Sequence, residues 1–159
     1  MIIRDATSQD AAAIAEIINA LVRDTTVTFT SIEKTRDDIS QAMSSTPGTY
    51  LVADVDDEVV GYASYGPFRA GPGYARAAEH SIALKTSSHR TGAGRALLMA
   101  LERRARAASI HCLIAGVSGE NLAGQAFHRA LGYHVVGQIS QVGRKFDRWL
   151  DLVLMQKFL

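Results

Sequence analysis

The sequence has little cysteine, little proline and almost no net charge, and each shortage excludes a class of protein. One of its 159 residues is cysteine and three are proline. The single thiol, Cys112, excludes a disulfide within the chain and fits a reducing compartment, where we expect it to be buried and structural rather than nucleophilic. A formal net charge of +1 gives no strong attraction to nucleic acid or to an acidic membrane.

Long apolar runs are also missing. No segment approaches the roughly 18 residues that a membrane helix needs, and Met1–Asp5 has no apolar region of the signal-peptide type. We therefore expect a cytoplasmic protein with no membrane partner. A length of 159 residues, 47% of them hydrophobic, predicts one domain over 1–159 with a substantial core.

The predicted elements follow the order β-α-α-β-β-β-α-β-α-β-β. Strands are expected at 2–4, 50–54, 59–65, 78–84, 111–117, 133–142 and 149–157, and helices from Ala11, at 36–44, from Gly94 to Ala108 and at 122–130. Hairpins and strand–helix–strand units both occur in this order. The pattern predicts an α/β fold, a mixed sheet with helices on both faces.

Capping and charge patterns add local detail. Thr7 with Asp10, and Thr35 with Asp38, have the spacing of capping boxes before the first two helices. The residues 143–148 are expected to form a loop between the last two strands.

The long helix has a run of charges off its apolar stripe. Glu102 and Arg106 are expected to form a surface pair four residues apart. Along the strand at 78–84, alternation places Glu79 on one face and His80, with Ile82, on the other.

A glycine-containing loop precedes the long helix. It comprises the residues His89, Arg90, Thr91, Gly92, Ala93, Gly94 and Arg95. Two glycines one residue apart let the backbone turn sharply, and the free N–H groups of the helix start behind them attract anions. The two arginines would pair with phosphates.

Two nucleotide-binding patterns fit this loop poorly. The Walker pattern needs Lys followed by Ser or Thr after the second glycine, and none follows. The dinucleotide fingerprint needs a third glycine, where Leu97 stands, and an acidic residue about 20 positions on, where Ile114 stands.

The loop His89-Arg90-Thr91-Gly92-Ala93-Gly94 resembles the pyrophosphate loop of the GCN5-related N-acetyltransferases (GNAT), whose pattern is Arg/Gln-x-x-Gly-x-Gly/Ala at a strand-to-helix junction. The chain resembles their phosphinothricin / methionine sulfoximine branch along nearly its whole length. The segments that carry this likeness are Val60–Gly66 and Gly143–Asp151. The resemblance implies the GNAT fold, in which two central parallel strands, here 78–84 and 111–117, splay apart around the cofactor.

The resemblance implies acetyl-CoA as co-substrate and no metal. The backbone of Ile82, Ala83 and Leu84 would pair with the pantetheine amides, and the N–H of Ile82 would polarise the thioester carbonyl. The residues from His89 to Arg95 would hold the pyrophosphate. Asn121 matches a position that hydrogen-bonds the pantetheine.

Two side chains match catalytic positions of the branch. Glu79 would be the general base, acting through water, and its structural alternative is a carboxylate paired with Arg76 or His80. His128 would protonate the leaving thiolate or assist the base. Its alternative is a surface or capping histidine.

The acceptor pocket is implied in two places. Phe29 follows the first helix, in a segment that lines the pocket in this branch, although it could equally pack beneath a loop. The loop after the third strand would receive the carboxylate of an amino acid-like acceptor. Its candidate residues are Arg69, Pro72, Gly73, Tyr74 and Arg76.

The sequence therefore predicts an N-acetyltransferase for a small amino acid-like amine such as methionine sulfoximine, methionine sulfone or phosphinothricin. Transfer would be direct, because no exposed nucleophilic cysteine is available. The branch implies a homodimer and a detoxifying role. Three alternatives stay open: a polyamine or protein amino terminus as acceptor, a non-catalytic acyl-CoA sensor, and a dinucleotide-binding module.

Overall fold

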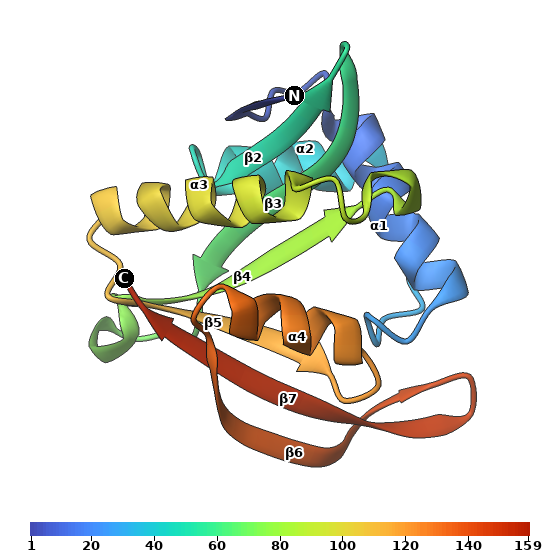
Figure 1. Cartoon of the computed structure of the whole chain (residues 1–159), viewed down its shortest axis with the longest axis vertical. Helices are drawn as coiled ribbons and strands as arrows, with labels where there is room; N and C mark the ends of the chain where they lie inside the picture. Colours follow the sequence, from blue (N-terminus) through green and yellow to red (C-terminus); the bar gives the residue numbers. More distant parts are fainter.

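The computed structural model describes residues 1–159 as one sheet covered by helices (Figure 1). The strands are β1 (Ile2–Asp5), β2 (Tyr50–Val55), β3 (Glu58–Pro67), β4 (Ala77–Leu84), β5 (Cys112–Ser118), β6 (His134–Lys145) and β7 (Arg148–Phe158). The helices are α1 (Ala11–Asp24), α2 (Arg36–Ser45), α3 (Ala93–Ala107) and α4 (Leu122–Ala130). The predicted order of elements is confirmed.

The sheet has the strand order β1-β2-β3-β4-β5-β7-β6, and β4 with β5 is its only parallel pair. That pair is short: its register runs from Ala77 opposite Cys112 to His80 opposite Ala115. Beyond it, β4 continues to Leu84 against β3, while β5 continues to Ser118 against β7. The two central strands therefore part in the middle of the sheet (Figure 1), as the resemblance implies.

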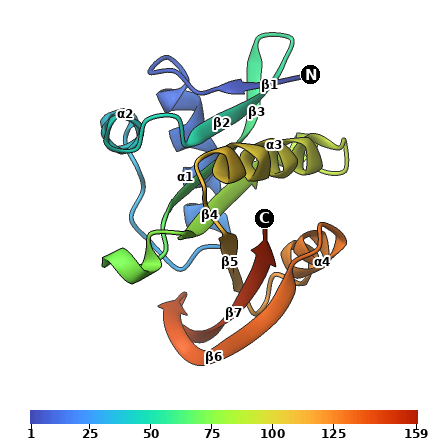
Figure 2. The same ribbon diagram turned by 90° about the vertical axis from the view of Figure 1, so that its left-hand side faces the viewer.

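Helices cover both faces of the sheet, which confirms the predicted layers. Figure 2 shows α1 and α2 on one side and α3 and α4 on the other. The larger core, 17 buried residues, gathers the apolar stripe of α3, and the smaller, 9 residues, lies under α1 and α2. The helices α1 and α3 thus each bury an apolar face. None of these helices is long and apolar enough to cross a membrane.

Two tight turns join the hairpins. Asp56 and Asp57 both have positive φ, which allows the two-residue turn between β2 and β3. Phe146 and Asp147 do the same between β6 and β7, so those strands extend to Lys145 and Arg148. The predicted loop at 143–148 was therefore too long, because a two-residue turn needs no further residues outside the ladder.

One capping prediction is confirmed and the other is wrong. The Thr35 side chain and the Asp38 carboxylate cap α2 reciprocally. Asp10, in contrast, lies at the start of α1 without capping it. Its carboxylate accepts hydrogen bonds from Thr7 and from the Arg4 guanidinium, which also binds Asp54 at 2.8 Å. A charged bidentate partner is a stronger attraction than a helix N–H group.

The expected surface pair of Glu102 with Arg106 is also wrong. Glu102 is 7% exposed and faces the sheet, where it accepts a hydrogen bond from Lys157 of β7 at 2.6 Å. A buried carboxylate needs a partner in the interior, and the end of β7 supplies one. Cys112 is buried, as expected.

The Arg4–Asp10 pair predicts an acid-sensitive contribution to stability. Arg4 lowers the pKa of the Asp10 carboxyl to about 2. A carboxyl group whose pKa is lowered by folding stabilises the native state when the pH is above the pKa of the group in the unfolded chain. That stabilisation is lost as the pH falls towards 2. We expect Asp10→Asn to lower the free energy of unfolding by about 2 kcal/mol at pH 7. Urea unfolding between pH 7 and pH 2.5 would show the difference shrinking. A difference independent of pH would contradict this account.

Candidate functional site

A cavity of about 210 Å³ lies where β4 and β5 part. Its walls come from both strands, the end of α1 and the segment after it, and α4. The lining residues are Ile18, Leu21, Val27, Thr28, Tyr62, Glu79, His80, Ser81, Ile82, Ala83, Ala115, Gly116, Val117, Asn121 and His128. The gap brings together Glu79 of β4, His128 of α4 and Asn121, the N-cap residue of α4, all of which the sequence predicts to be functional.

Glu79 stands over the gap without a partner. It forms no ion pair or hydrogen bond with the protein, so pairing with Arg76 or His80 is excluded. Its carboxylate lies above Gly116 of β5, where a Cβ would come 2.9 Å from Oε1. One side of the carboxylate faces protein, and this partial burial raises its pKa. An unpaired carboxylate with a raised pKa is suited to accept a proton near neutral pH.

His128 is held in one tautomer by the helix that carries it. Its Nδ1 lies 2.7 Å from the carbonyl oxygen of Gly124. A carbonyl only accepts, so Nδ1 must be the donor and the neutral ring keeps its lone pair on Nε2. Burial lowers the His128 pKa, while the bond to Gly124 and the charge of Glu102 act in the opposite direction. His128 is thus buried, and it is neither a surface nor a capping histidine.

His80 is a member of the site that our sequence analysis did not assign. It is 6% exposed, and neither ring nitrogen has a hydrogen-bond partner. Its ring centre lies 5.1 Å from that of His128 and 5.5 Å from that of Tyr133. Burial lowers its pKa to about 3, with a smaller effect from His128. The available signal was an ionisable residue on the apolar face of its strand.

The glycine loop is exposed just before the start of α3. Gly92, the N-cap residue of α3, has a φ of 91° and no side chain to cap the helix, and the Thr91 hydroxyl accepts only the Ala93 N–H, at 3.4 Å. Arg90 and Arg95 are exposed and form no ion pair. Gly94 lies against Leu84, since a Cβ there would meet the Leu84 side chain at 3.0 Å. The start of α3 therefore lies beside the end of β4, where a phosphate group would fit.

The edge of β4 facing the gap can accept an extended chain. Ile82, Ala83 and Leu84 lie beyond the last pair with β5, and all three continue along β3. Peptide-like amides can add to such an edge as another strand would. Asn121 is close by: its Oδ1 accepts from the Gly124 N–H at 2.8 Å, and its amide nitrogen makes no hydrogen bond within the chain. These features fit a pantetheine arm leading to a pyrophosphate.

The predicted acceptor residues lie outside the cavity lining. The ring of Phe29 packs on Gly143, so that a Cβ there would overlap it. The Arg76 guanidinium donates to the carbonyl of Ser109 at 2.9 Å, and Arg69 stacks on Phe68 at 5.5 Å. The rest of that loop, with Pro72, Gly73 and Tyr74, is exposed. Their role in acceptor binding stays a prediction.

Comparisons with known proteins agree with this geometry. Residues 3–154 match the acetyltransferase (GNAT) domain. An L-methionine sulfoximine/L-methionine sulfone acetyltransferase of Pseudomonas aeruginosa is 38% identical, over 97% of this chain and 92% of that protein. The crystal structure of a ribosomal-protein-alanine N-acetyltransferase from Brucella melitensis has a TM-score of 0.95 at 39% identity, covering 100% of both chains. The crystal structure of a phosphinothricin acetyltransferase from Sinorhizobium meliloti, in complex with acetyl-CoA, has a TM-score of 0.94 at 32% identity. The match covers 99% of this chain and 88% of that chain.

The two buried histidines should be visible in a pH titration. Nitrogen-15 NMR of the imidazole rings should show His80 neutral from pH 8 to pH 5, because burial lowers its pKa to about 3. His128 should show the Nδ1–H tautomer and titrate below the ordinary value for histidine. His80→Asn and His128→Asn variants would assign the signals. Titration of His80 between pH 5 and pH 8 would contradict the structure.

Proposed function

We propose that the acceptor of this chain is the amino group of a small amino acid analogue. The chain belongs to the GNAT acetyltransferase family, which transfers acetyl groups from acetyl-CoA to an amine. Methionine sulfoximine and methionine sulfone lead the proposal, with phosphinothricin next. The carrying observation is the unpaired Glu79 carboxylate over a narrow gap, in a chain that aligns with the Pseudomonas aeruginosa enzyme over 97% of its length. We propose that 1–159 acts as one catalytic domain in the cytoplasm, and that acetylation detoxifies the analogue.

Acetyl-CoA would lie across the gap, with its diphosphate at the start of α3. The uncapped N–H groups there, with the side chains of Arg90 and Arg95, supply positive charge for the two phosphates. The open edge of β4 supplies backbone groups for the pantetheine amides. The N–H of Ile82 is assigned to the thioester carbonyl, whose developing negative charge it would stabilise. Asn121 supplies its free amide nitrogen to the same arm.

Glu79 is assigned as the base. The acceptor amine must lose a proton as its nitrogen bonds to the thioester carbon and the carbon–sulfur bond breaks. The proton passes to Glu79 through water, and the leaving thiolate takes a proton from solvent. The raised pKa of Glu79 improves its match to this task, because a base is most effective when its pKa lies near the working pH.

His128 is assigned to assist the base. With Nδ1 donating to Gly124, a neutral His128 keeps only the lone pair of Nε2, an atom that is buried without a hydrogen-bond partner. The ring has no proton at Nε2 to give the thiolate, and it would accept a hydrogen bond there from a water or amine that enters this buried space. The fixed tautomer therefore favours assistance to Glu79 over protonation of the leaving group.

The homodimer belongs to this proposal. β6 is an edge strand, and it carries exposed apolar side chains together with the turn and β7 beside it. They are Val135, Val136, Ile139, Val142, Phe146 and Trp149. An exposed apolar edge strand favours association with another surface, and a second copy of this chain offers a matching edge.

The acceptor is tested by thiol release from acetyl-CoA. The panel holds methionine sulfoximine, methionine sulfone, phosphinothricin, the common amino acids, spermidine and a peptide with an amino-terminal alanine. We expect turnover with the first three and a loss of about 100-fold in kcat for Glu79→Gln. Turnover of the alanine peptide alone would instead favour the activity named for the Brucella melitensis relative.

The pH profile gives a second measure of the base. Activity should fall as the pH drops through the raised pKa of Glu79, since only the carboxylate accepts a proton, and this acid limb should vanish in Glu79→Gln. Gly116→Ala retains the Glu79 carboxyl group but shifts its position, because the new Cβ would come 2.9 Å from Oε1. It should lower kcat while the acid limb persists. An acid limb unchanged in Glu79→Gln would exclude Glu79 as the base.

The dimer is tested by light scattering after size exclusion. The wild type should show twice the 17.1 kDa of one chain. Replacing Val136 and Val142 together by Glu should halve that mass, because charges would then have to be buried at the interface. Ile32→Glu, at an apolar residue that is 71% exposed elsewhere, is the control and should leave the mass unchanged. A monomeric wild type would overturn the proposed dimer.

A further inference from the structure

We infer that Lys145 is a positioning residue for the acceptor. It fixes the segment after α1, which forms one wall of the cavity, to the hairpin of β6 and β7. The inference rests on the proposed function, because it concerns the acceptor half of the same site. In the sequence, Lys145 is distinguished only by its place in the Gly143–Asp151 segment that resembles the branch.

The environment of Lys145 is unusual for a lysine. It is 5% exposed, and its ammonium group forms no ion pair. Nζ donates to the carbonyl oxygens of Thr25 at 2.6 Å and Thr28 at 2.9 Å, and lies 3.5 Å from that of Leu21. A buried cation raises the free energy of the folded state unless its N–H donors are satisfied. The ammonium group therefore holds these carbonyl oxygens within hydrogen-bond distance.

The carbonyls that receive the ammonium group lie at the end of α1 and just after it. Thr25 is the C-terminal cap of that helix, and its N–H donates to Leu21. The negative end of the helix dipole therefore faces Nζ and stabilises the cation without a carboxylate. The ring of Phe146, 5.1 Å from Nζ, adds a further attraction.

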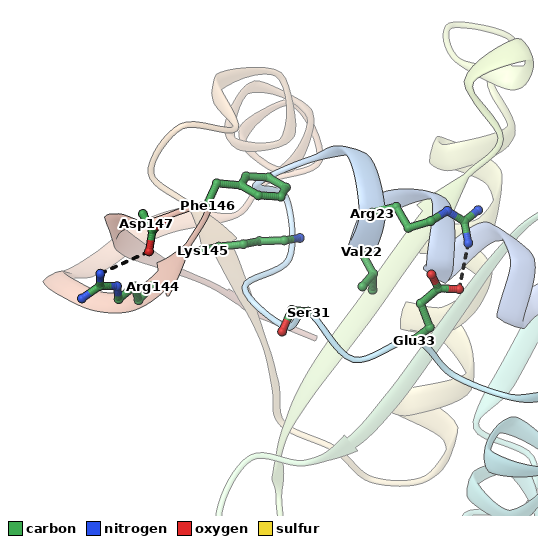
Figure 3. A pocket seen from close by; sticks show the side chains of 8 residues that line it. All are labelled: Val22, Arg23, Ser31, Glu33, Arg144, Lys145, Phe146 and Asp147. Carbon is green, nitrogen blue, oxygen red and sulfur yellow. Dashed lines mark hydrogen bonds and ion pairs between the residues drawn. The ribbon is translucent and has the colours of Figure 1, made fainter.

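The neighbouring charges are already paired with one another. Figure 3 shows Lys145 extending from the hairpin towards the segment after α1, with Arg23 paired to Glu33 and Arg144 to Asp147. These four line the same surface cavity of about 420 Å³. Neither carboxylate, Glu33 or Asp147, binds Lys145. The ammonium group therefore forms its hydrogen bonds with the backbone of the segment after α1.

The segment has two more attachments to the hairpin. Phe29 lies on Gly143, two residues before Lys145. Thr26 donates to Glu120 at 2.8 Å, and Glu120 is itself held by Arg148 at 2.6 Å. Val27 and Thr28 are therefore flanked by two attached residues. Thr26 before them binds Glu120, which Arg148 of β7 holds, and Phe29 after them packs on Gly143 of β6.

Val27 and Thr28 are the residues of this segment that line the active cavity. The backbone carbonyl of Thr28 binds Lys145, while the same residue faces the space beside Glu79. The acceptor wall is thus positioned by a lysine that does not line the cavity. The edge of β4 and the start of α3, assigned to acetyl-CoA, form no hydrogen bond or ion pair with Lys145, whose side-chain hydrogen bonds all go to Leu21, Thr25 and Thr28.

Lys145→Met tests this role, because methionine keeps an unbranched side chain that reaches to the position of Cε and removes the donors of Nζ. We expect the KM for the acceptor to rise about ten-fold, equivalent to about 1.4 kcal/mol. The KM for acetyl-CoA should change less than about two-fold, since the acetyl-CoA groups lie elsewhere. A loss of folded protein alone would lower kcat without separating the two KM values.

Two further variants complete the experiment. Arg144→Met removes the neighbouring cation of the same hairpin and should leave both KM values unchanged. Gly143→Ala displaces Phe29 and leaves Lys145 intact, and it should also raise the acceptor KM. The position of the segment can therefore be tested even if Lys145→Met does not fold. A folded, active Lys145→Met enzyme with an unchanged acceptor KM would overturn the role of Lys145, whatever the result for Gly143→Ala; if Lys145→Met does not fold, an unchanged acceptor KM in Gly143→Ala would overturn the role of the attached segment. A wild type inactive on the whole panel would instead overturn the proposed function.

Discussion

The rest of the site depends on the separation of β4 and β5. The two parallel strands share four register positions, and each then continues with a different neighbour. Backbone groups along the end of β4 are therefore left for a ligand, and side chains from both faces of the sheet reach one space. Without the gap, Glu79 and the ring of His128 would lie on opposite sides of a closed sheet.

Burial around the gap sets the charge of its side chains. Glu79 is partly shielded and unpaired, so the pKa of its carboxyl is raised. His80 and His128 lie deeper, where desolvation lowers the pKa of each ring. The same physical cause acts with opposite sign on an acid and on a base. It leaves two neutral imidazoles beside one carboxylate able to take up a proton, which is a suitable arrangement for deprotonating an amine.

The two halves that we propose for the site, one for acetyl-CoA and one for the acceptor, are built from different parts of the chain. The acetyl-CoA half combines β4 with the start of α3, which follow one another in sequence. The acceptor half combines the segment after α1 with a hairpin more than 110 residues later, joined through Lys145. Since β6 and β7 also carry the apolar surface proposed for the dimer, the acceptor wall and that surface share one hairpin.

The sequence by itself determined the order of elements, the two-sided helix layers and the glycine loop, because these follow from local periodicity, caps and turns. It also placed Glu79 and His80 on opposite faces of their strand. Tertiary structure alone decided which charges meet: Glu102 with Lys157 rather than Arg106, Asp10 with Arg4 rather than a helix end, and Lys145 with three carbonyls. Such partners lie far apart in sequence, and a buried charge binds whatever the fold brings within reach. For the same reason the pKa direction of Glu79 and the tautomer of His128 became visible only once the surrounding atoms were in place.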